Sequence, residues 1–369
     1  MGISSEMIQT RKLPLHNIHV QQGARMGSFG EWEVPLYYSS VLEEHEAVRA
    51  GVGIFDISHM GEIYFEGPAA FRALDFLITN QLQKLTIGKA LYSPICNDRG
   101  GIVDDLVIYR LSADVYLVIV NASNVAKDYD WFLHHNIEKA QITDRTEKTG
   151  LLSVQGPKSL ELLKTIFSEP IERLSYYSIM EAPSLSNNAL VARTGYTGEL
   201  GFEILIRTED LENTYQVIME KGKKFGIKPI GFGARDTLRL EACMLLYGQD
   251  MDDEITPLEA GLERTINFEK EFLGRFSLLE AKERGIQKKL VGFEMIGHGL
   301  ARHGYPILKN GHSIGQVTSG SFSPTTKKNI GLAYVSTKES EIGNEIDIQI
   351  RSNMVRAEIV KTPFYKKPK

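Results

Sequence analysis

The chain has 369 residues, of which 42% are hydrophobic and 24% charged, and its Lys, Arg, Asp and Glu residues give a formal net charge of −5. This composition excludes a disordered chain and predicts roughly two or three domains at this length. The slight acidity argues against a nucleic-acid-binding protein, which would need a strongly basic face.

The cellular location is predicted from cysteine content and hydropathy. Two cysteines, Cys96 and Cys243, are too few for a disulfide framework or a four-ligand zinc site, and we interpret them as free thiols. No stretch reaches the ~18 uninterrupted apolar residues that a membrane helix needs. Residues 1–12 lack the apolar core of a secretory signal. We therefore expect a cytoplasmic protein with no membrane partner.

The first predicted elements are helices and strands of a mixed domain. Residues 41–50 have helical apolar spacing and are followed by Gly51, which suits a C-terminal cap. Residues 62–66 read as a strand that leads into a helix through a Gly-Pro pair. Residues 101–109 and 115–120 predict two antiparallel strands joined by a polar turn.

The second half of the chain repeats part of this pattern. Residues 151–154 again predict a strand followed by Gly-Pro and a helix, so an internal duplication and chance are equally good explanations. A hairpin is expected over residues 190–206, a loop and helix over 231–245, and a helix over 276–284. From residue 289 onward, short apolar runs between turn residues predict a small all-β domain.

The familiar catalytic signatures are missing from this sequence. It has no Walker loop, dinucleotide fingerprint, H-E-x-x-H or G-x-S-x-G motif, and its nine histidines do not cluster at ligand spacing. We therefore expect no metal site. General acid–base or electrostatic catalysis on a bound ligand is the chemistry left open.

An aspartate pair inside an apolar strand is the first candidate for that chemistry. Asp104 and Asp105 stand in NDRGGIVDDLVIY, residues 97–109. Successive strand residues face opposite sides, so both carboxylates cannot enter one pocket. Burial would raise the pKa of the inward carboxyl group, which suits proton handling. A strand-end Asp that leans toward solvent is the alternative.

Two later segments hold further charged candidates. Glu203 follows a glycine-rich turn on a predicted strand, where its two oxygens suit a cationic or amide-like ligand edge. Arg235 lies at a loop-to-helix junction, and its planar guanidinium suits carboxylate recognition. A surface-facing Glu203 and an ion pair of Arg235 with a neighbouring acid are the alternatives.

Together these segments resemble the aminomethyltransferase of the glycine cleavage system, the T-protein family. Ten motifs occur in the family's order over essentially the whole chain. They are GARM at 23–26, FDISHMG at 55–61, GGIVDDL at 100–106, VNAS at 120–123, SVQGP at 153–157, GYTGE at 195–199, GARDTLRLEA at 233–242, LYGQDMD at 246–252, TPLEAGL at 256–262 and TSGSFSPT at 318–325.

The resemblance implies an α+β fold with three lobes around a central folate pocket, antiparallel sheets and a C-terminal β-barrel. The first lobe would be discontinuous, with residues 1–54 and 151–250, and residues 55–150 would form an inserted second α+β lobe. A linker with a helix, residues 251–285, would lead to the barrel lobe at residues 286–369.

The resemblance also implies roles for individual residues. Asp104, the first Asp of GGIVDDL, matches the family's catalytic aspartate, and Glu203 and Arg235 match folate-binding residues. A C-terminal tyrosine used by some relatives has no clear counterpart in the tail TPFYKKPK. The residues implied to line the pterin pocket or stack on folate are Tyr196, Met60, Tyr92 and Phe268, the last where several relatives have Trp.

The implied reaction transfers the methylene of an aminomethyl group from the lipoyl arm of H protein to tetrahydrofolate. Its products would be 5,10-methylenetetrahydrofolate, ammonia and the dihydrolipoyl carrier. Tetrahydrofolate would be a co-substrate, with no flavin or nicotinamide. Arg284, Lys288 and Lys289 form a candidate docking patch for the acidic carrier, and an ordinary solvated surface is the alternative.

Three other functions are alternatives to this one. A folate domain related to dimethylglycine or sarcosine dehydrogenases would bring a flavin domain with a dinucleotide fingerprint. A folate-dependent factor for iron–sulfur cluster assembly would carry K-G-C-Y-x-G-Q-E, where this chain has GYTGELG. A module that docks a carrier without catalysis stays open from sequence alone.

Overall fold

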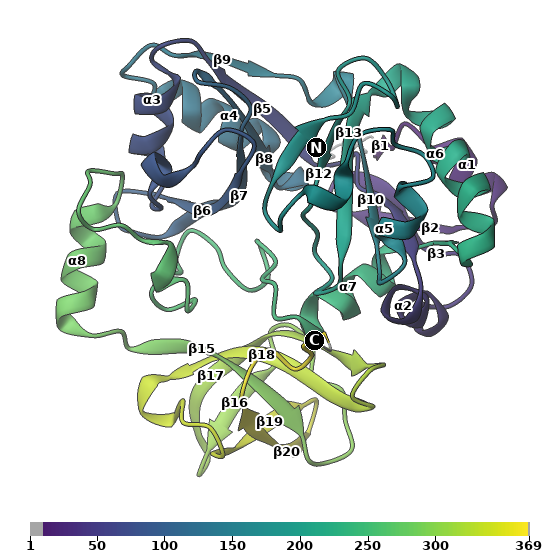
Figure 1. Ribbon diagram of the computed structural model, residues 1–369. Coiled ribbons are helices and arrows are strands. Elements are labelled where there is room, and N and C mark those ends of the chain that lie inside the picture. Colours follow the sequence, from purple (N-terminus) through teal and green to yellow (C-terminus); the bar gives the residue numbers. More distant parts are fainter. Residues whose placement is uncertain (1–9, 368–369) are drawn as a thin grey trace, which may run out of the picture.

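The computed structural model describes residues 10–367 and has three parts, two α+β lobes side by side and a β-barrel next to them (Figure 1). The interpretation that no secretory signal is present rests mainly on residues 1–9, which lie outside the described residues. No helix within the described part is long and apolar enough to cross a membrane.

The first lobe is built on a six-stranded sheet with the order β11-β12-β13-β10-β4-β14. All its pairs are antiparallel except β14 with β4. Because β4 precedes the second lobe in the chain and the other strands follow it, this sheet is assembled from two distant segments. The strands are β4 (Gly53–Asp56), β10 (Thr149–Gln155), β11 (Ile179–Glu181), β12 (Leu190–Ala192), β13 (Gly201–Arg207) and β14 (Lys228–Pro229).

Helices cover the outer face of this sheet. The alternating residues Phe202, Ile204 and Ile206 of β13 pack into one apolar cluster with buried residues of α5 and α6 and a half-buried residue of α1. A smaller sheet, β1-β3-β2, lies beside it. The remaining bounds are α1 (His16–Gln21), α5 (Ser159–Leu163), α6 (Thr208–Gly222), β1 (Arg11–Lys12), β2 (Arg25–Phe29) and β3 (Trp32–Tyr37).

The second lobe is a continuous segment with a five-stranded antiparallel sheet, β6-β7-β8-β5-β9. Two helices cover one of its faces and share a buried apolar cluster with it. The predicted strand pair of residues 101–109 and 115–120 is confirmed as β7 and β8. The elements are β5 (Gly61–Glu66), α3 (Ala70–Leu77), β6 (Ala90–Cys96), β7 (Ile102–Arg110), β8 (Val115–Val120), α4 (Val125–His134) and β9 (Gln141–Asp144).

The uncovered faces of the two sheets meet each other. Tyr109 and Leu117 of the second lobe share one buried cluster with Phe55 and Leu205 of the first. Two helices of the first lobe, α2 (Val41–Ala50) and α7 (Phe232–Glu241), close this layer. We call the space between the two sheets the inter-lobe layer. Since it is a shared apolar core, it fixes how the lobes sit against each other.

The last part of the chain is a closed six-stranded barrel, as predicted for the all-β C-terminal domain. Closure leaves no unpaired sheet edge. The segment before it carries α8 (Arg275–Arg284), close to the expected helix at 276–284. The barrel strands are β15 (Lys288–Met295), β16 (Pro306–Lys309), β17 (His312–Ser323), β18 (Lys328–Ser336), β19 (Glu345–Ile350) and β20 (Asn353–Val360).

Seven 3₁₀ turns complete the described secondary structure. They are η1 (Leu82–Lys84), η2 (Ala122–Asn124), η3 (Thr146–Lys148), η4 (Ile171–Arg173), η5 (Lys223–Phe225), η6 (Glu263–Thr265) and η7 (Thr337–Glu339). The proposed lobe boundary at residues 54 and 55 cuts through β4, which pairs with β10. We therefore propose that the inserted lobe begins after Asp56.

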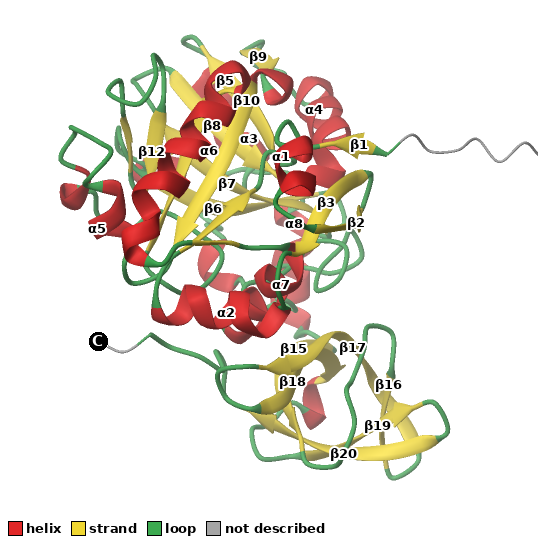
Figure 2. Ribbon diagram, turned by 90° about the vertical axis from the view of Figure 1, so that its right-hand side faces the viewer, coloured by secondary structure: helices red, strands yellow, loops and turns green. Residues whose placement is uncertain are grey.

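Buried charges on α7 join the first lobe to the barrel, and Figure 2 shows α2 and α7 at this junction. Glu241 accepts hydrogen bonds from Arg49 Nη2 at 2.8 Å and from the backbone N and hydroxyl of Thr325 at 2.9 and 2.7 Å. Arg239 donates to Asp250 at 2.5 Å, and Thr318 of β17 donates to the same carboxylate at 2.6 Å. These bonds hold α7 in place from both sides.

The pKa of Glu241 makes this junction sensitive to acid. Burial alone would raise that pKa, but hydrogen bonds and the charge from His45, with bonds from Ser323 and Arg49, lower it to about 2. The unfolded chain therefore binds a proton more readily than the folded one. The resulting stability is present above the ordinary pKa of 4.5 and is lost as pH falls toward 2.

We predict that Glu241→Gln lowers the free energy of unfolding at pH 7 by about 3 kcal/mol, because it removes one of the two buried carboxylates paired with Arg49, the other being Glu199. The variant should also lose much of the wild-type acid dependence between about pH 5 and pH 2. Urea unfolding followed by circular dichroism across this range measures both effects. Glu345, whose ion pair with Arg356 is exposed, is the matched control, and Glu345→Gln should cost less than about 1 kcal/mol.

Candidate active site

The two aspartates of β7 lie on opposite faces of the five-stranded sheet. Asp104 is on the face of Leu106 and Ile108, which pack in the cluster beneath α3 and α4. Asp105 is on the face of Val107 and Tyr109, which pack in the inter-lobe layer. The ladder is irregular between the pairs Ile95–Asp104 and Cys96–Ile102, so a bulge directly precedes the aspartates. Only Asp105 therefore faces the first lobe.

Asp104 is fully buried and its oxygens are already occupied. Oδ1 accepts hydrogen bonds from the side-chain amides of Asn121 at 2.9 Å and Asn124 at 2.7 Å. Oδ2 accepts the backbone N–H of Asn121 at 3.1 Å. A carboxylate with three donors and helix α4 over it has no route to a ligand between the lobes. This placement speaks against the sequence-based role of Asp104 as the catalytic aspartate.

Asp105 is half-buried and has the properties expected of a proton-handling group. Burial, together with the charge of Asp104, raises its pKa to about 7, while hydrogen bonds from Tyr92 and Asn121 oppose the shift. Asn121 Nδ2 lies 2.9 Å from Asp105 Oδ1. Near neutral pH this carboxyl group can therefore both take up and release a proton.

Glu203 of β13 reaches the inter-lobe layer from the opposite sheet. The Thr194 hydroxyl donates to Glu203 Oε2, and Tyr109 OH of β7 lies 2.9 Å from the same hydroxyl oxygen. This chain of hydrogen bonds links the two sheets. Burial raises the pKa of Glu203, while the bond from Thr194 and the charge of Arg235 lower it. Oε1 accepts no hydrogen bond from the described residues, so it can accept one from a ligand.

Arg235 and Tyr196 lie next to each other beside Glu203. The guanidinium carbon of Arg235 is 4.7 Å from the centre of the Tyr196 ring, within the range of a cation–π contact. Tyr196 OH donates to the carbonyl oxygen of Leu245 at 2.5 Å, which fixes the ring. Within residues 10–367 the Arg235 side chain makes no hydrogen bond or ion pair, so its donors are free for an acceptor.

Met60 and Tyr92 complete the set of predicted residues that the structure brings together. Tyr92 pairs with Val107 across the β6–β7 ladder and so shares the inter-lobe face with Asp105. Burial and the neighbouring Asp105 raise the pKa of Tyr92 far above its ordinary value, which keeps its hydroxyl protonated. Met60 packs in the same inter-lobe cluster as Val107 and Tyr109.

Phe268 lies elsewhere. It belongs to the apolar cluster of Cys96, Phe272 and Leu278 beneath α8, and Lys282 Nζ lies 5.0 Å from its ring centre. Cys96 is four residues beyond Tyr92 on β6, roughly 13 Å along an extended strand. Phe268 therefore packs α8 onto the second lobe, and this contact gives no support to its predicted stacking role.

Two residues near these groups, Tyr177 and His59, were not predicted from the sequence. Tyr177 has a φ of 59°, rare for a non-glycine residue, and its carbonyl oxygen accepts the backbone N–H of Ala90 at 3.0 Å. His59 is buried between Phe29 and Phe232, and burial together with Arg235 lowers its pKa to about 3. No periodicity or turn signal marks these two, although His59 stands inside the FDISHMG motif.

The C-terminal tyrosine also has a defined place. The Arg49 guanidinium carbon lies 3.9 Å from the ring centre of Tyr365, and the Tyr365 backbone N–H donates to the backbone carbonyl oxygen of Glu241 at 2.9 Å. Burial and the hydrogen bond to Glu199 raise the pKa of Tyr365 to about 12. Tyr365 thus packs against the GYTGE turn and α7, and its contacts do not include Glu203 or Arg235.

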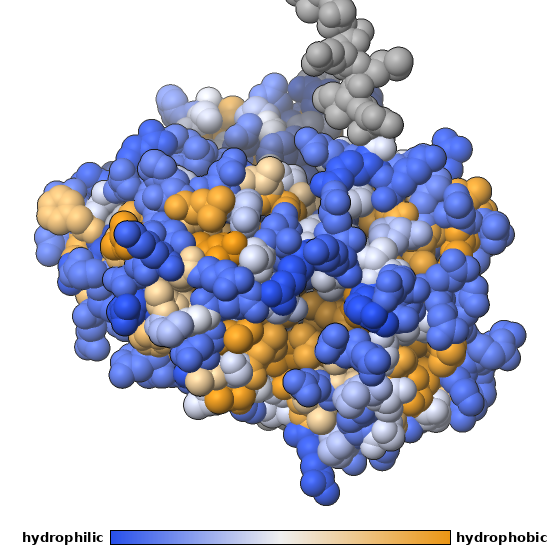
Figure 3. All heavy atoms as spheres, turned by 90° about the horizontal axis from the view of Figure 1, so that it is seen from above, coloured by the Kyte–Doolittle hydropathy of each residue, from blue (hydrophilic) through white to orange (hydrophobic). Residues whose placement is uncertain are grey.

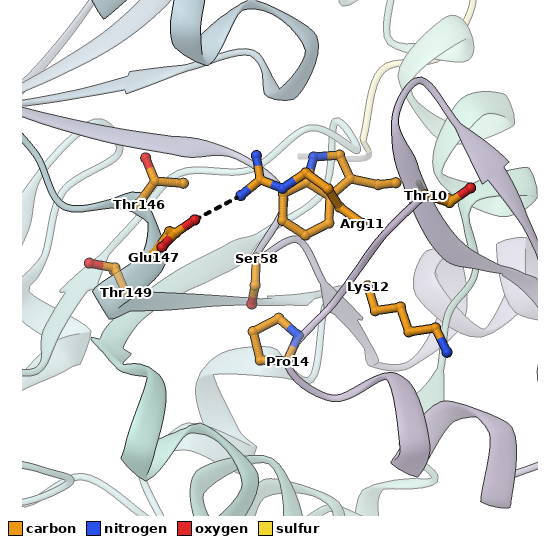
Figure 4. A pocket seen from close by; sticks show the side chains of 9 residues that line it. Thr10, Arg11, Lys12, Pro14, Ser58, Thr146, Glu147 and Thr149 are labelled. Carbon is orange, nitrogen blue, oxygen red and sulfur yellow. Dashed lines mark hydrogen bonds and ion pairs between the residues drawn. The ribbon is translucent and has the colours of Figure 1, made fainter. Parts of the chain in front are cut away.

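An open pocket of about 690 Å³ lies away from these residues, beside β1 (Figure 4). None of the predicted ligand-binding residues lines it. Its charged lining residues are Arg11, Lys12 and Glu147, and Arg11 pairs with the exposed Glu147 at 3.5 Å. We therefore place the active site in the inter-lobe layer. Seen from above the two lobes, hydrophobic side chains show between hydrophilic ones across this face (Figure 3).

The described residues hold no group of three His, Cys, Asp or Glu side chains that could bind a metal ion. Cys96 and Cys243 are both free. The chemistry available in the inter-lobe layer is therefore that of two carboxyl groups, a guanidinium and several protonated tyrosines. Such a set can bind a ligand with both donor and acceptor edges and can move protons on it.

Comparison with known proteins defines the class of this molecule. Residues 15–270 match the model of the GCVT N-terminal domain, and residues 288–366 match that of the glycine cleavage T-protein C-terminal barrel domain. The chain therefore belongs to the glycine cleavage T-protein family. These matches confirm the family, the fold class and the enzymatic function predicted from the ten motifs.

Individual relatives agree with this assignment. Proteins named aminomethyltransferase from Caldanaerobacter subterraneus and Bacillus subtilis are 45% and 43% identical, over 97% of this chain and 96% and 99% of their own lengths. The crystal structure of the glycine cleavage system aminomethyltransferase T from Bartonella henselae superposes with a TM-score of 0.92. It is 31% identical and covers 97% of this chain and 99% of its own.

Proposed function

We propose that the chain transfers a methylene group from the aminomethylated lipoyl arm of an H protein to tetrahydrofolate, in the inter-lobe layer. The site assignment rests on two tyrosines that these groups share. The charges of Asp105 on β7 and Glu203 on β13 both act on Tyr177, and those of Asp105 and of Arg235 on α7 both act on Tyr196. Family membership supplies the reaction, and the layer supplies groups that suit it. A cytoplasmic location stays a prediction.

The atoms of this reaction show what the protein must do. The aminomethyl carbon loses its bonds to nitrogen and sulfur and gains bonds to N5 and N10 of tetrahydrofolate. Each folate nitrogen gives up one hydrogen, and the released ammonia and lipoyl thiol each gain one. The site must therefore hold the folate amine against the carbon and manage two proton transfers.

We propose Asp105, rather than Asp104, as the carboxylate that meets tetrahydrofolate. Asp105 faces the inter-lobe layer and has a pKa of about 7, so its carboxylate can accept a proton from a folate nitrogen. Its negative charge also stabilises the positive charge that develops as ammonia leaves. Asp104, behind the sheet, influences Asp105 through its charge and through Asn121.

Residues from both lobes would orient the pterin. Glu203 Oε1 is available to accept hydrogen bonds from amide-like N–H groups, which the pterin ring presents. Arg235 would bind an acceptor oxygen, and the protonated Tyr92 and Tyr196 would provide flat surfaces and donors. Met60 would give an apolar contact. We omit Phe268 from this set because its contacts lie beneath α8.

The carrier would dock on the outside of the molecule. Arg284 and Lys289 are exposed at the end of α8 and the start of β15, and Lys288 is half-buried with Nζ 5.6 Å from the ring centre of Tyr334. This placement is compatible with a basic patch for the acidic H protein. A solvated surface remains the alternative for these three side chains.

The primary test compares Asp105→Asn with Asp104→Asn. We predict that Asp105→Asn lowers ammonia release ~10²–10⁴-fold, the usual size of a lost general acid–base group. Asp104→Asn should retain most turnover but move the midpoint of the pH–rate profile below pH 7, because it removes the charge that helps to raise the pKa of Asp105. A reconstituted assay with lipoylated carrier and tetrahydrofolate measures both.

The reverse pattern, with Asp104→Asn inactive and Asp105→Asn near normal, would contradict our assignment. As controls, both variants should bind tetrahydrofolate and should unfold at nearly the wild-type temperature. Tetrahydrofolate binding without ammonia release by the wild type would favour a carrier-docking module over the enzyme.

Glu203 gives a separate prediction about binding. Glu203→Gln should weaken the binding of tetrahydrofolate about 10- to 100-fold, because a hydrogen bond to a charged acceptor contributes ~1.5–3 kcal/mol. Isothermal titration calorimetry without carrier measures this directly. Glu181, exposed on β11 of the same sheet, is the control, and Glu181→Gln should bind as the wild type does. Equal affinity of wild type and Glu203→Gln would remove Glu203 from the site.

A further inference from the structure

The back face of the five-stranded sheet contains a second buried carboxyl group, Asp128 of α4, whose function the reaction does not explain. Asp128 is fully buried, and neither of its oxygens accepts a hydrogen bond from a described donor when the side chain is ionised. Lys127 Nζ is 4.0 Å from Oδ1, too far for a hydrogen bond, and bonds instead to Val103 and Tyr247. An ionised Asp128 would have only the 4.0 Å ion pair with the exposed Lys127 to offset its buried charge, and no hydrogen bond.

Asp104 is the neighbour that gives buried Asp128 a hydrogen-bond partner. Asn124, which donates to Asp104 Oδ1 at 2.7 Å, stands one helical turn before Asp128, so both side chains lie on the face of α4 that meets Asp104. Burial, with the charge of Asp104 and a hydrogen bond to it, raises the pKa of Asp128 far above its ordinary value. Two carboxylates cannot bond without a proton between them. Asp104 already accepts three N–H hydrogen bonds from Asn121 and Asn124, so its oxygens act as acceptors in this network. The proton therefore belongs to Asp128.

Asn121 connects this pair to the front of the sheet. Its Nδ2 lies 2.9 Å from Asp104 Oδ1 and 2.9 Å from Asp105 Oδ1, with the Asp105 carbonyl oxygen at 3.3 Å. An amide nitrogen carries only two hydrogens, so a change in the hydrogen bond from Asn121 to Asp104 also changes the hydrogen bond from Asn121 to Asp105. The back-face pair therefore controls how the Asp105 carboxylate is held.

We propose that Asp128 is a positioning residue, which shares its proton with Asp104 and so holds Asn121 in the orientation that fixes Asp105 toward the ligand. This inference rests on the proposed role of Asp105. It assigns a function to a carboxyl group that touches no substrate and to Asn121 of the VNAS motif. A neutral hydrogen-bond donor at position 128 is what the network needs, and a second charge there would disrupt it.

An infrared measurement on the purified chain, without folate or carrier, tests the proton directly. The carbonyl band of a protonated carboxylic acid should be present at pH 7 in the wild type and should decrease in Asp128→Asn. Asp130, exposed two residues away on α4, is the matched control, and Asp130→Asn should keep the band. An unchanged band in Asp128→Asn overturns the proposal, whatever the outcome for Asp105→Asn.

Turnover of two variants tests the positioning role. Asp128→Asn keeps a donor toward Asp104 and should retain kcat within about threefold, whereas Asp128→Leu, of similar size, should lower kcat about 10- to 100-fold with little change in the KM for tetrahydrofolate. An equal loss in both variants, or a rise in KM alone, would contradict the proposal. If Asp128→Leu does not fold, the infrared comparison and the kcat of Asp128→Asn decide.

Discussion

The alternation of side chains along β7 is the constraint on which the site depends. Asp104 and Asp105 are neighbours in the chain but lie in different layers, because successive strand residues point to opposite faces. One carboxylate is surrounded by amide donors beneath α4, and the other faces the second sheet with a pKa near 7. A single strand thus provides a reactive group on one face and its support on the other.

The helix α7 provides the second half of this arrangement. Arg235, near its start, faces the inter-lobe layer, while Arg239 and Glu241, further along, are locked into ion pairs and hydrogen bonds with the barrel and α2. The buried charges are satisfied by several partners each, which is the condition for tolerating them. The barrel thereby holds in place the helix that carries Arg235, the residue proposed to bind folate.

Local patterns predicted most of the fold. Helical spacing with Gly51 gave α2 at its observed bounds, and alternating apolar runs gave β7, β8 and the barrel. The site was harder to predict from the sequence. The alternation of residues along a strand shows that Asp104 and Asp105 face opposite ways, but it does not show which face a helix covers. That depends on α4 packing behind β7, a contact between distant segments. The place of Phe268 could not be read from the sequence for a similar reason, since its neighbours come from β6 and α8.

The split first lobe has a consequence for synthesis of the chain. Strand β4 leaves the ribosome about 90 residues before its partner β10, whereas every strand of the five-stranded sheet lies within the intervening segment. Chains emerge from the ribosome at ~5–20 residues per second, and strands that are close in sequence pair first. The second lobe can therefore fold before β4 pairs with β10. The second lobe would then serve as the surface on which the first lobe assembles, so the inter-lobe layer forms only after the second lobe has folded.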